Sequence, residues 1–266
     1  MSDATYDGMF GPETVTWEVG REAVLLLGGG RALILQIAHP LVAAGVEQHS
    51  SYDTDPWGRL YRTVDVTTRI AFGDRETSAA AAAALRRVHA RVTGEAPDGT
   101  PYWANRPDLL LWVWATLLDT SLCVYRRYVG SLSRGEVERY YAEQSRFALA
   151  CGVPDREWPA GYDAFRDYFD ATVEDVLHPS DDSRRIVTAV LGGAVPLALR
   201  PVSAALNLAT IGLLPPTLRE RLGYEWGPGR QALLDASSFT LRRAIGLVPS
   251  PLRELPAARA ARRRAA

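Results

Sequence analysis

Histidines are the side chains of this sequence best suited to acid/base chemistry or metal binding, and there are four of them. His39 precedes Pro40, which disfavours helical geometry at the histidine, and its neighbours are apolar. We therefore expect a buried, hydrogen-bonded imidazole there. His89 lies on the apolar side of a helical stretch. It is either a satisfied core residue or an imidazole that a globin-like helix presents to a haem iron.

The other two histidines have less distinctive surroundings. His49 lies in a polar stretch with Glu47, where the two could act as an acid/base pair or simply face solvent. His178 follows Glu174 by one helical turn, but Pro179 places it at a helix end. A single pair of this kind cannot hold a metal, so we expect His178 to interact with the helix dipole.

A cationic cluster precedes His89 in the chain. Arg59 and Thr63 are four residues apart, and Arg62 is three residues after Arg59, so a helix would present all three on one face. Two guanidinium groups and a hydroxyl suit a carboxylate, a propionate or an oxygen intermediate. A surface arginine pair accounts for the spacing equally well.

Several common catalytic motifs are excluded by their context. The glycine run at 28–30 has no preceding strand and no following Gly-Lys-Ser/Thr, so it is not a phosphate loop. No Glu-x-x-His element for a diiron bundle and no Gly-x-Ser-x-Gly nucleophile elbow occurs.

The elements that must position these side chains are helices. Apolar residues recur at three- and four-residue intervals, and no two-residue alternation typical of strands appears. Ser133 and Glu136 have the spacing of a capping box at a helix start. We predict one all-α domain over 1–266 with roughly ten helices, the clearest of them at 79–92, 107–128, 133–150, 162–177 and 229–245.

The composition is that of a globular protein. The 266 residues are 47% hydrophobic with a formal charge of only -1, which excludes a disordered chain and gives no reason to expect nucleic acid. All 30 basic residues are arginines, which we attribute to codon usage. Two cysteines and an acidic, polar start without an apolar signal region predict a cytoplasmic protein.

Two C-terminal segments need separate expectations. The apolar stretch 186–214 is interrupted by glycines, prolines and an arginine, so we expect a buried hairpin of core helices rather than a membrane span. The basic tail at 250–266 is expected to be a frayed, solvated helix end. Peripheral contact with an anionic membrane is the alternative.

Ordered sequence blocks resemble one known family. They are DPWGRLYRT at 55–63, IAFGD at 70–74, VHARVTG at 88–94, AHPLVAAGVEQHS at 38–50, WVWAT at 112–116 and RYYAE at 139–143. Together these blocks, spread over 15–169, resemble the DUF2236 family of the latex-clearing protein and the fungal MpaB-type oxygenases.

The resemblance implies an all-α, globin-like core that holds b-type haem and oxidative cleavage of a carbon–carbon double bond in isoprenoid chains. His89 matches the haem-ligating histidine, while Arg59 and Thr63 match the arginine and threonine of the family motif. Rubber-cleaving members carry a lysine one place before that threonine, and here the position is Arg62. A guanidinium stays protonated and cannot ligate iron, so the resemblance implies neither a distal-lysine state nor rubber as the substrate.

The leading hypothesis is a haem-b oxygenase that uses dioxygen on a lipophilic small molecule. It assigns His89 to the iron, Arg59, Arg62 and Thr63 to catalysis, and His39 to the cofactor pocket. The alternatives are a non-catalytic haem- or lipid-binding protein and a haem-free enzyme that uses the same His/Arg cluster. The sequence leaves the oligomeric state open.

Overall fold

In the computed structural model, which describes residues 7–50, 56–192 and 197–265, helices make up almost all of the regular structure. The N-terminal part contains α1 (Val15–Gly20), the 3-10 helix η1 (Ala23–Gly28), α2 (Gly29–Ile37), α3 (Pro40–His49), α4 (Pro56–Phe72) and α5 (Arg75–His89). The middle part contains β1 (Thr93–Glu95), β2 (Pro101–Trp103), α6 (Pro107–Tyr128), α7 (Arg134–Cys151), η2 (Asp155–Glu157) and α8 (Tyr162–Asp175). The C-terminal part contains α9 (Asp181–Gly192), η3 (Leu197–Leu199), α10 (Arg200–Gly212), α11 (Pro216–Arg221), α12 (Pro228–Leu247), α13 (Ser250–Arg253) and α14 (Pro256–Ala265). The all-α class is confirmed.

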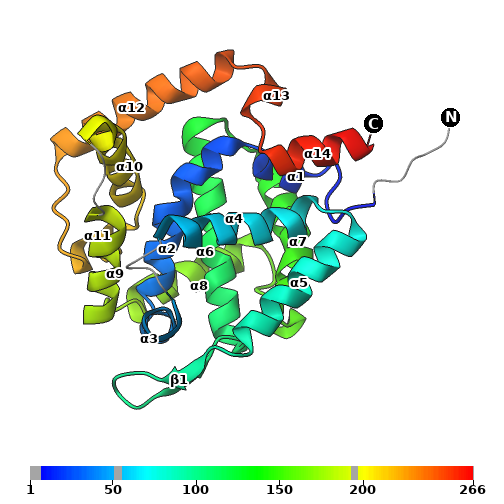
Figure 1. The fold of residues 1–266 in the computed structure, drawn as a ribbon. Helices are drawn as coiled ribbons and strands as arrows, with labels where there is room; N and C mark the ends of the chain where they lie inside the picture. The colour runs from blue at the N-terminus through cyan, green and yellow to red at the C-terminus, as the bar shows by residue number, and fades with distance from the viewer. Residues whose placement is uncertain (1–6, 51–55, 193–196, 266) are drawn as a thin grey trace.

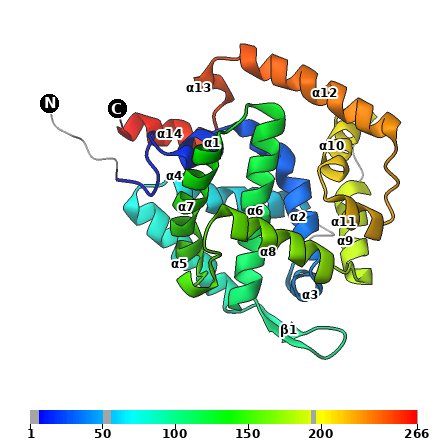
Figure 2. The same ribbon diagram turned by 180° about the vertical axis from the view of Figure 1, so that it is seen from behind.

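Helix α6 forms the centre of the molecule (Figures 1 and 2). Fourteen of its 22 residues are buried, and it packs against α1, α2, α7 and α12. Its bounds match the predicted helix because Pro107 suits the first turn and apolar residues recur around the helix. By length and composition α6 could cross a membrane, and the described residues contain up to three such segments in all, α6 included, if each of two bent helix pairs is one span. In the structure, however, 72% of the apolar window of α6 is buried inside the protein.

The predicted capping box of α7 is present. The Ser133 hydroxyl accepts a hydrogen bond from the Glu136 amide, and the Glu136 carboxylate accepts one from the Ser133 amide. The helix ends at Gly152, whose φ of 102° is a left-handed conformation that glycine adopts without strain. Local sequence signals therefore fix both ends of this helix.

The expectation of no strands was wrong at one place. A hairpin pairs Thr93 with Trp103 and Glu95 with Pro101, each strand being only three residues long. Alternation cannot be recognised over three residues. The hairpin instead depends on its turn, where Gly99 has a φ of 81° and the Asp98 carboxylate accepts a hydrogen bond from the Thr100 amide at 2.9 Å.

The apolar stretch 186–214 is only partly a core hairpin. Ile186 and Ile211 are buried, but Leu197 is 76% exposed and Val202 is 57% exposed. Helix η3 and the start of α10 therefore present apolar side chains to solvent, contrary to the expectation.

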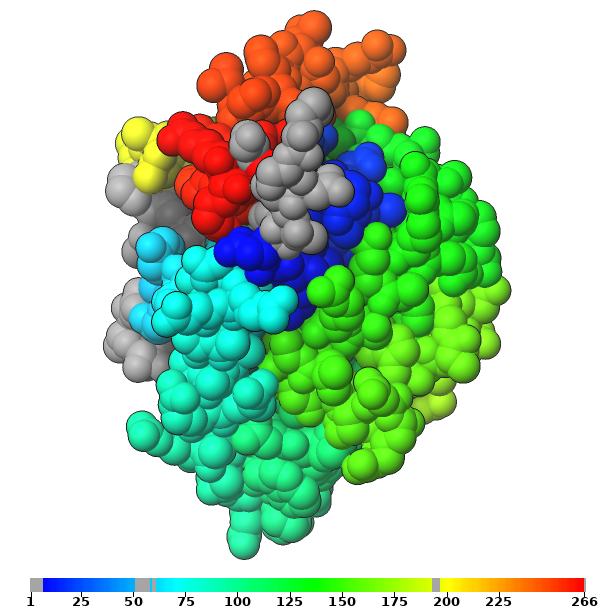
Figure 3. Space-filling view, turned by 90° about the vertical axis from the view of Figure 1, so that its right-hand side faces the viewer, coloured from blue at the N-terminus to red at the C-terminus, as the bar shows by residue number. Residues whose placement is uncertain are grey.

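The expectation of a frayed C-terminal tail was also wrong. Ala258 and Ala261 of α14 are fully buried against Trp17 and Phe72, whose rings meet edge-to-face with centroids 5.2 Å apart. Figure 3 shows α14 (red) beside the N-terminal segment (blue) and above the α4–α5 region (cyan). Small alanine side chains allow this close packing, so the basic tail is part of the fold.

Candidate functional site

His89 is the last residue of α5, rather than an interior residue of a helix over 79–92 as expected. The helix begins at the cap residue Asp74, whose carboxylate accepts a hydrogen bond from the Thr77 amide at 2.7 Å. The His89 Nδ1 atom is buried and has no hydrogen-bond partner among the described residues, and burial lowers the pKa of the imidazole. The ring is therefore neutral at neutral pH, which is the state that a metal ligand requires.

The apolar surroundings expected of His89 are incomplete. Leu85 packs against the main core, but Val88 is 59% exposed. The interpretation of His89 as an ordinary core residue is therefore weakened.

His39 provides a second neutral imidazole. It has the extended backbone expected before proline, with φ of -76° and ψ of 121°, and it precedes the first turn of α3. Its Nδ1 atom is buried as expected, and this nitrogen has no hydrogen-bond partner within the part of the chain that the structure describes. Burial lowers the pKa of His39 to about 4, with Asp108 raising it and Arg106 lowering it further.

Both imidazoles belong to the end of the molecule where α6 begins. The Ala104 amide donates to the Val92 carbonyl at 2.9 Å, and the Asn105 side chain donates to the Arg86 carbonyl at 3.3 Å. These bonds fix the start of α6 to the end of α5, which carries His89. His39 is close enough to the same start of α6 for Asp108 and Arg106 to affect its charge.

The residues predicted on α4 are only partly described. Helix α4 packs against α5 after the short connection at Gly73 and Asp74, so the family motif lies on the neighbour of the His89 helix. Arg62 and Thr63 are exposed, whereas the side chain of Arg59 lies outside the described residues. How these three side chains face the His89 ring stays a prediction.

The remaining polar candidates have structural partners. His49 Nε2 lies 3.0 Å from the Thr93 carbonyl, so an Nε2–H donor holds α3 against the hairpin. Glu47 pairs with Arg185 of α9 at 3.1 Å. Their possible acid/base role stays a prediction. His178 is exposed and lies beyond Asp175, where α8 ends, so the expected position at a helix end was wrong.

The glycine run allows close packing of helices. A Cβ added at Gly28 would lie 2.5 Å from Thr120 Cγ2, and one at Gly30 would lie 2.5 Å from Thr210 Oγ1. These contacts explain why glycine occurs at two positions of a run that lacks the context of a phosphate loop.

Sequence reasoning missed a buried ion cluster. Arg31 donates to Asp119 at 2.6 Å, to Thr120 at 2.6 Å and to the Leu213 carbonyl at 2.6 Å, and Arg166 pairs with the other oxygen of Asp119. The available signal was an aspartate inside the apolar helix 107–128, because a buried carboxylate requires a cationic or hydrogen-bonding partner.

The described residues contain no group of three or more His, Cys, Asp or Glu side chains that could hold a metal ion. A non-haem iron site of the two-histidine, one-carboxylate type therefore has no counterpart in that part of the chain.

Relatives found by sequence comparison cover most of the chain. A 28% identical relative over 232 residues, covering 82% of this chain and 87% of the relative, is the uncharacterized protein Rv2237 of Mycobacterium tuberculosis. The uncharacterized protein Mb2261 of Mycobacterium bovis matches to the same extent. No solved structure matches the chain.

The family model of the ER-bound oxygenase mpaB/B'/rubber oxygenase catalytic domain matches residues 16–249. This match extends well beyond the blocks at 15–169 and includes α4, α5, α6 and the C-terminal helices up to α12. The chain therefore belongs to the mpaB/rubber oxygenase catalytic-domain family, a family of oxygenases.

Proposed function

We propose that the protein is a haem-b-dependent oxygenase that acts on a carbon–carbon double bond of a lipophilic, isoprenoid-like small molecule. The observation that carries the proposal is the His89 imidazole, which is uncharged, has a buried Nδ1 without a partner in the described ranges and ends a helix of an oxygenase-family fold. A b-type haem would supply the redox-active iron that dioxygen chemistry requires.

The residues at this end of the molecule fit such a group. His89 would hold the iron, and the neutral His39 would line the cofactor pocket near the start of α6. The helices that carry the proposed site each contribute a partly buried apolar side chain, namely Leu33 (α2), Val42 (α3), Val66 (α4) and Leu85 (α5). Apolar walls exclude water and suit a lipophilic substrate.

The α4 residues would act as hydrogen-bond donors. A guanidinium remains protonated, so Arg59 and Arg62 would stabilise negative charge that develops during oxygen chemistry. The Thr63 hydroxyl can both donate and accept, and it would orient oxygen or one guanidinium. Arg62 cannot ligate iron as a lysine could, which favours a small substrate over rubber.

The cofactor assignment is tested by haem loading of the purified full-length chain. We expect a Soret band at one haem per chain, which His89→Ala abolishes. His39→Ala is the informative comparison, because His39 also has a buried Nδ1 without a partner. His178→Ala is the matched exposed control. Loss of the band in His39→Ala but not in His89→Ala would move the ligand to His39, and a chain that cannot be loaded would overturn haem dependence.

Oxygen uptake separates the proposal from its two alternatives. A loaded protein that consumes no oxygen with any isoprenoid alkene supports a haem- or lipid-binding protein. Turnover that is equal with and without haem, but lost in His39→Ala, supports the haem-free enzyme. The proposed oxygenase requires haem-dependent oxygen uptake coupled to loss of the alkene.

Arg62→Lys gives an independent spectroscopic test. A lysine amine can lose its proton and ligate iron, whereas the guanidinium cannot. We expect the lysine variant to show a shifted Soret band at alkaline pH, while Arg62→Gln keeps the wild-type position. An unchanged spectrum in Arg62→Lys would place residue 62 away from the iron.

A further inference from the structure

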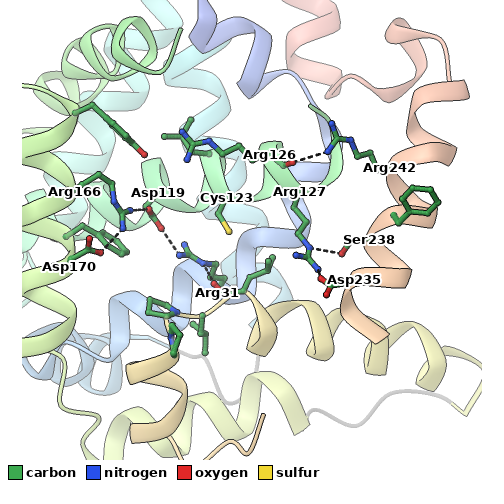
Figure 4. A pocket seen from close by; sticks show the side chains of 18 residues that line it. Arg31, Asp119, Cys123, Arg126, Arg127, Arg166, Asp170, Asp235, Ser238 and Arg242 are labelled. Carbon is green, nitrogen blue, oxygen red and sulfur yellow. Dashed lines mark hydrogen bonds and ion pairs between the residues drawn. The ribbon is translucent and has the colours of Figure 1, made fainter. Parts of the chain in front are cut away.

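A pocket of about 870 Å³ lies toward the opposite end of α6 (Figure 4). Its walls come from α2, α6, α8, α12 and the segment 213–216. Its floor is apolar and buried, and includes Leu122, Phe169, Leu213 and Leu214. A volume in this range is typical of small-molecule sites.

The pocket is separate from the proposed haem site. His39 is sensitive to Asp108 near the start of α6, whereas the pocket is lined from Asp119 to Arg127 of the same helix. At a rise of 1.5 Å per residue, Asp108 and Cys123 are about 22 Å apart along the helix axis. A ligand in this pocket would therefore not occupy the oxygenase site.

The pocket carries a surplus of positive charge. Five arginines and three aspartates line it. Arg31 and Arg166 both pair with Asp119, Arg166 also pairs with Asp170, and Arg127 pairs with Asp235 at 2.5 Å.

The other two arginines, Arg126 and Arg242, have no carboxylate partner among the described residues. Arg242 makes only a long hydrogen bond of 3.5 Å to the Arg126 carbonyl. The charges of the three paired arginines and the three aspartates cancel. Arg126 and Arg242 therefore leave about two positive charges in the lining of the pocket.

Hydrogen bonds of the buried Arg31 hold another part of the pocket wall in place. Arg31 is 4% exposed, and its bonds to Asp119, Thr120 and the Leu213 carbonyl join α2, α6 and the 213–216 segment. Because these groups satisfy one another, Arg126 and Arg242 remain available to an incoming anion.

An apolar contact at the rim completes the pocket. Phe239 of α12 lines it and is 62% exposed. The combination of free guanidinium groups, an apolar floor and an exposed aromatic rim matches a molecule with an anionic head and an apolar body.

We propose that this pocket is a binding site for an amphipathic organic anion, whose carboxylate or phosphate is attracted by the positive charge of Arg126 and Arg242 and whose apolar chain lies against Phe239 and the buried floor. This function is independent of the haem proposal.

Calorimetric titration of the full-length protein tests the proposal. Decanoate and decyl phosphate distinguish the two anionic heads, and decyltrimethylammonium supplies the same chain with a cationic head. We expect 1:1 binding of at least one anion and at least tenfold weaker binding of the cation. Inorganic phosphate alone should bind more than tenfold more weakly than decyl phosphate.

Variants locate the site. Arg126→Gln with Arg242→Gln should weaken anion binding at least tenfold, and the Arg31–Asp119 cluster that supports the fold is left intact. Arg263→Gln on α14 is the matched control, since it removes one exposed arginine outside the pocket. Phe239→Ser should weaken binding of the anions with a decyl chain without changing the charge.

Alkylation of Cys123 reports whether the ligand binds in this pocket. It lines the pocket, whereas Cys151 lies at the end of α7, so ligand should slow alkylation of Cys123 and leave Cys151 unchanged. Equal affinity for the anions and the cation, wild-type affinity in the double variant, or no protection of Cys123 would overturn the proposal. Unchanged anion binding in His89→Ala would support a site independent of haem.

Discussion

The Arg31 guanidinium and the Asp119 carboxylate, 88 residues apart in the sequence, form a 2.6 Å ion pair in the interior of the protein. Arg166 of α8 pairs with the second oxygen of Asp119, so one carboxylate joins three helices. The glycine at position 28 brings α6 close enough for this arrangement.

Arg31→Ala should strongly destabilise the protein. The substitution leaves Asp119 with only Arg166 and removes hydrogen bonds to Thr120 and the Leu213 carbonyl. Breaking a buried pair costs about 3–5 kcal/mol, because the remaining charge stays buried. Urea denaturation followed by circular dichroism measures the loss.

Two comparisons control this prediction. The double variant Arg31→Met with Asp119→Leu should cost less than Arg31→Ala alone, because no isolated charge remains. Arg134→Ala, which breaks exposed ion pairs with Glu138 and Asp163, should change stability little. Equal effects of Arg31→Ala and Arg134→Ala would contradict the structural role of the cluster.

Gly28→Ala should destabilise the protein by about 1–3 kcal/mol, the usual range for overpacking. The new methyl group would lie 2.5 Å from Thr120 Cγ2 and 2.9 Å from Val124 Cγ2. Adding Thr120→Ser removes the closer methyl but keeps the hydroxyl that Arg31 uses, so it should restore part of the stability in urea denaturation. Gly229→Ala, where an added Cβ meets nothing within 4 Å, is the matched control.

His39 should make the folded protein less stable in acid. Its pKa falls from 6.5 to about 4 on folding, mainly through burial. As the pH drops from 6.5 to 4, the unfolded chain binds a proton that the folded protein does not, so stability decreases and then levels off below pH 4. The shift corresponds to up to about 3 kcal/mol.

The measurement is the free energy of unfolding of wild type and His39→Gln between pH 7 and 4. The variant should lose less stability over this window, and His178→Gln should follow wild type. Parallel pH profiles for wild type and His39→Gln would show that His39 is not buried as a neutral ring.

Because α14 is docked on the protein, substitutions at the neighbouring residues Ala260 and Ala261 should differ strongly in their effect on stability. Ala261 is fully buried, whereas Ala260 is exposed. Ala261→Asp should cost at least about 1–3 kcal/mol by burying an unpaired polar group, and Ala260→Asp should cost little. For a chain of this size each kcal/mol lowers the Tm by about 2–4 °C. Equal Tm values would mean that the helix does not remain docked in solution.

The sequence predicted the elements whose signals are local. Periodicity and Pro107 located α6, and Ser133 with Glu136 located the start of α7. The short helices α1, α11 and α13 have six residues or fewer, so they show too little periodicity to be recognised. The family resemblance is confirmed by the match over 16–249.

What could not be predicted depends on contacts between distant segments. The buried state of His89 Nδ1 follows from where the start of α6 is held, and nothing near this histidine in the sequence specifies it, whereas the apolar neighbours of His39 did predict its burial. The burial of Ala258 and Ala261 requires Trp17 and Phe72, which lie far away in the sequence. The functional roles of Arg59, Arg62 and Thr63 rest on the resemblance and stay predictions.

The seating of α14 also has a consequence for biosynthesis. Arg21 and Glu254 bond across 233 positions of the chain, so the N-terminal helix gains part of its packing from residues that are made much later. Most of the polypeptide would have left the ribosome before the contact between Arg21 and Glu254 could form. Contacts of such long range slow folding, because a large loop must be ordered before they form. Newly made chains would therefore expose Trp17 and Phe72 during translation, and a chaperone that binds aromatic segments would have its target there.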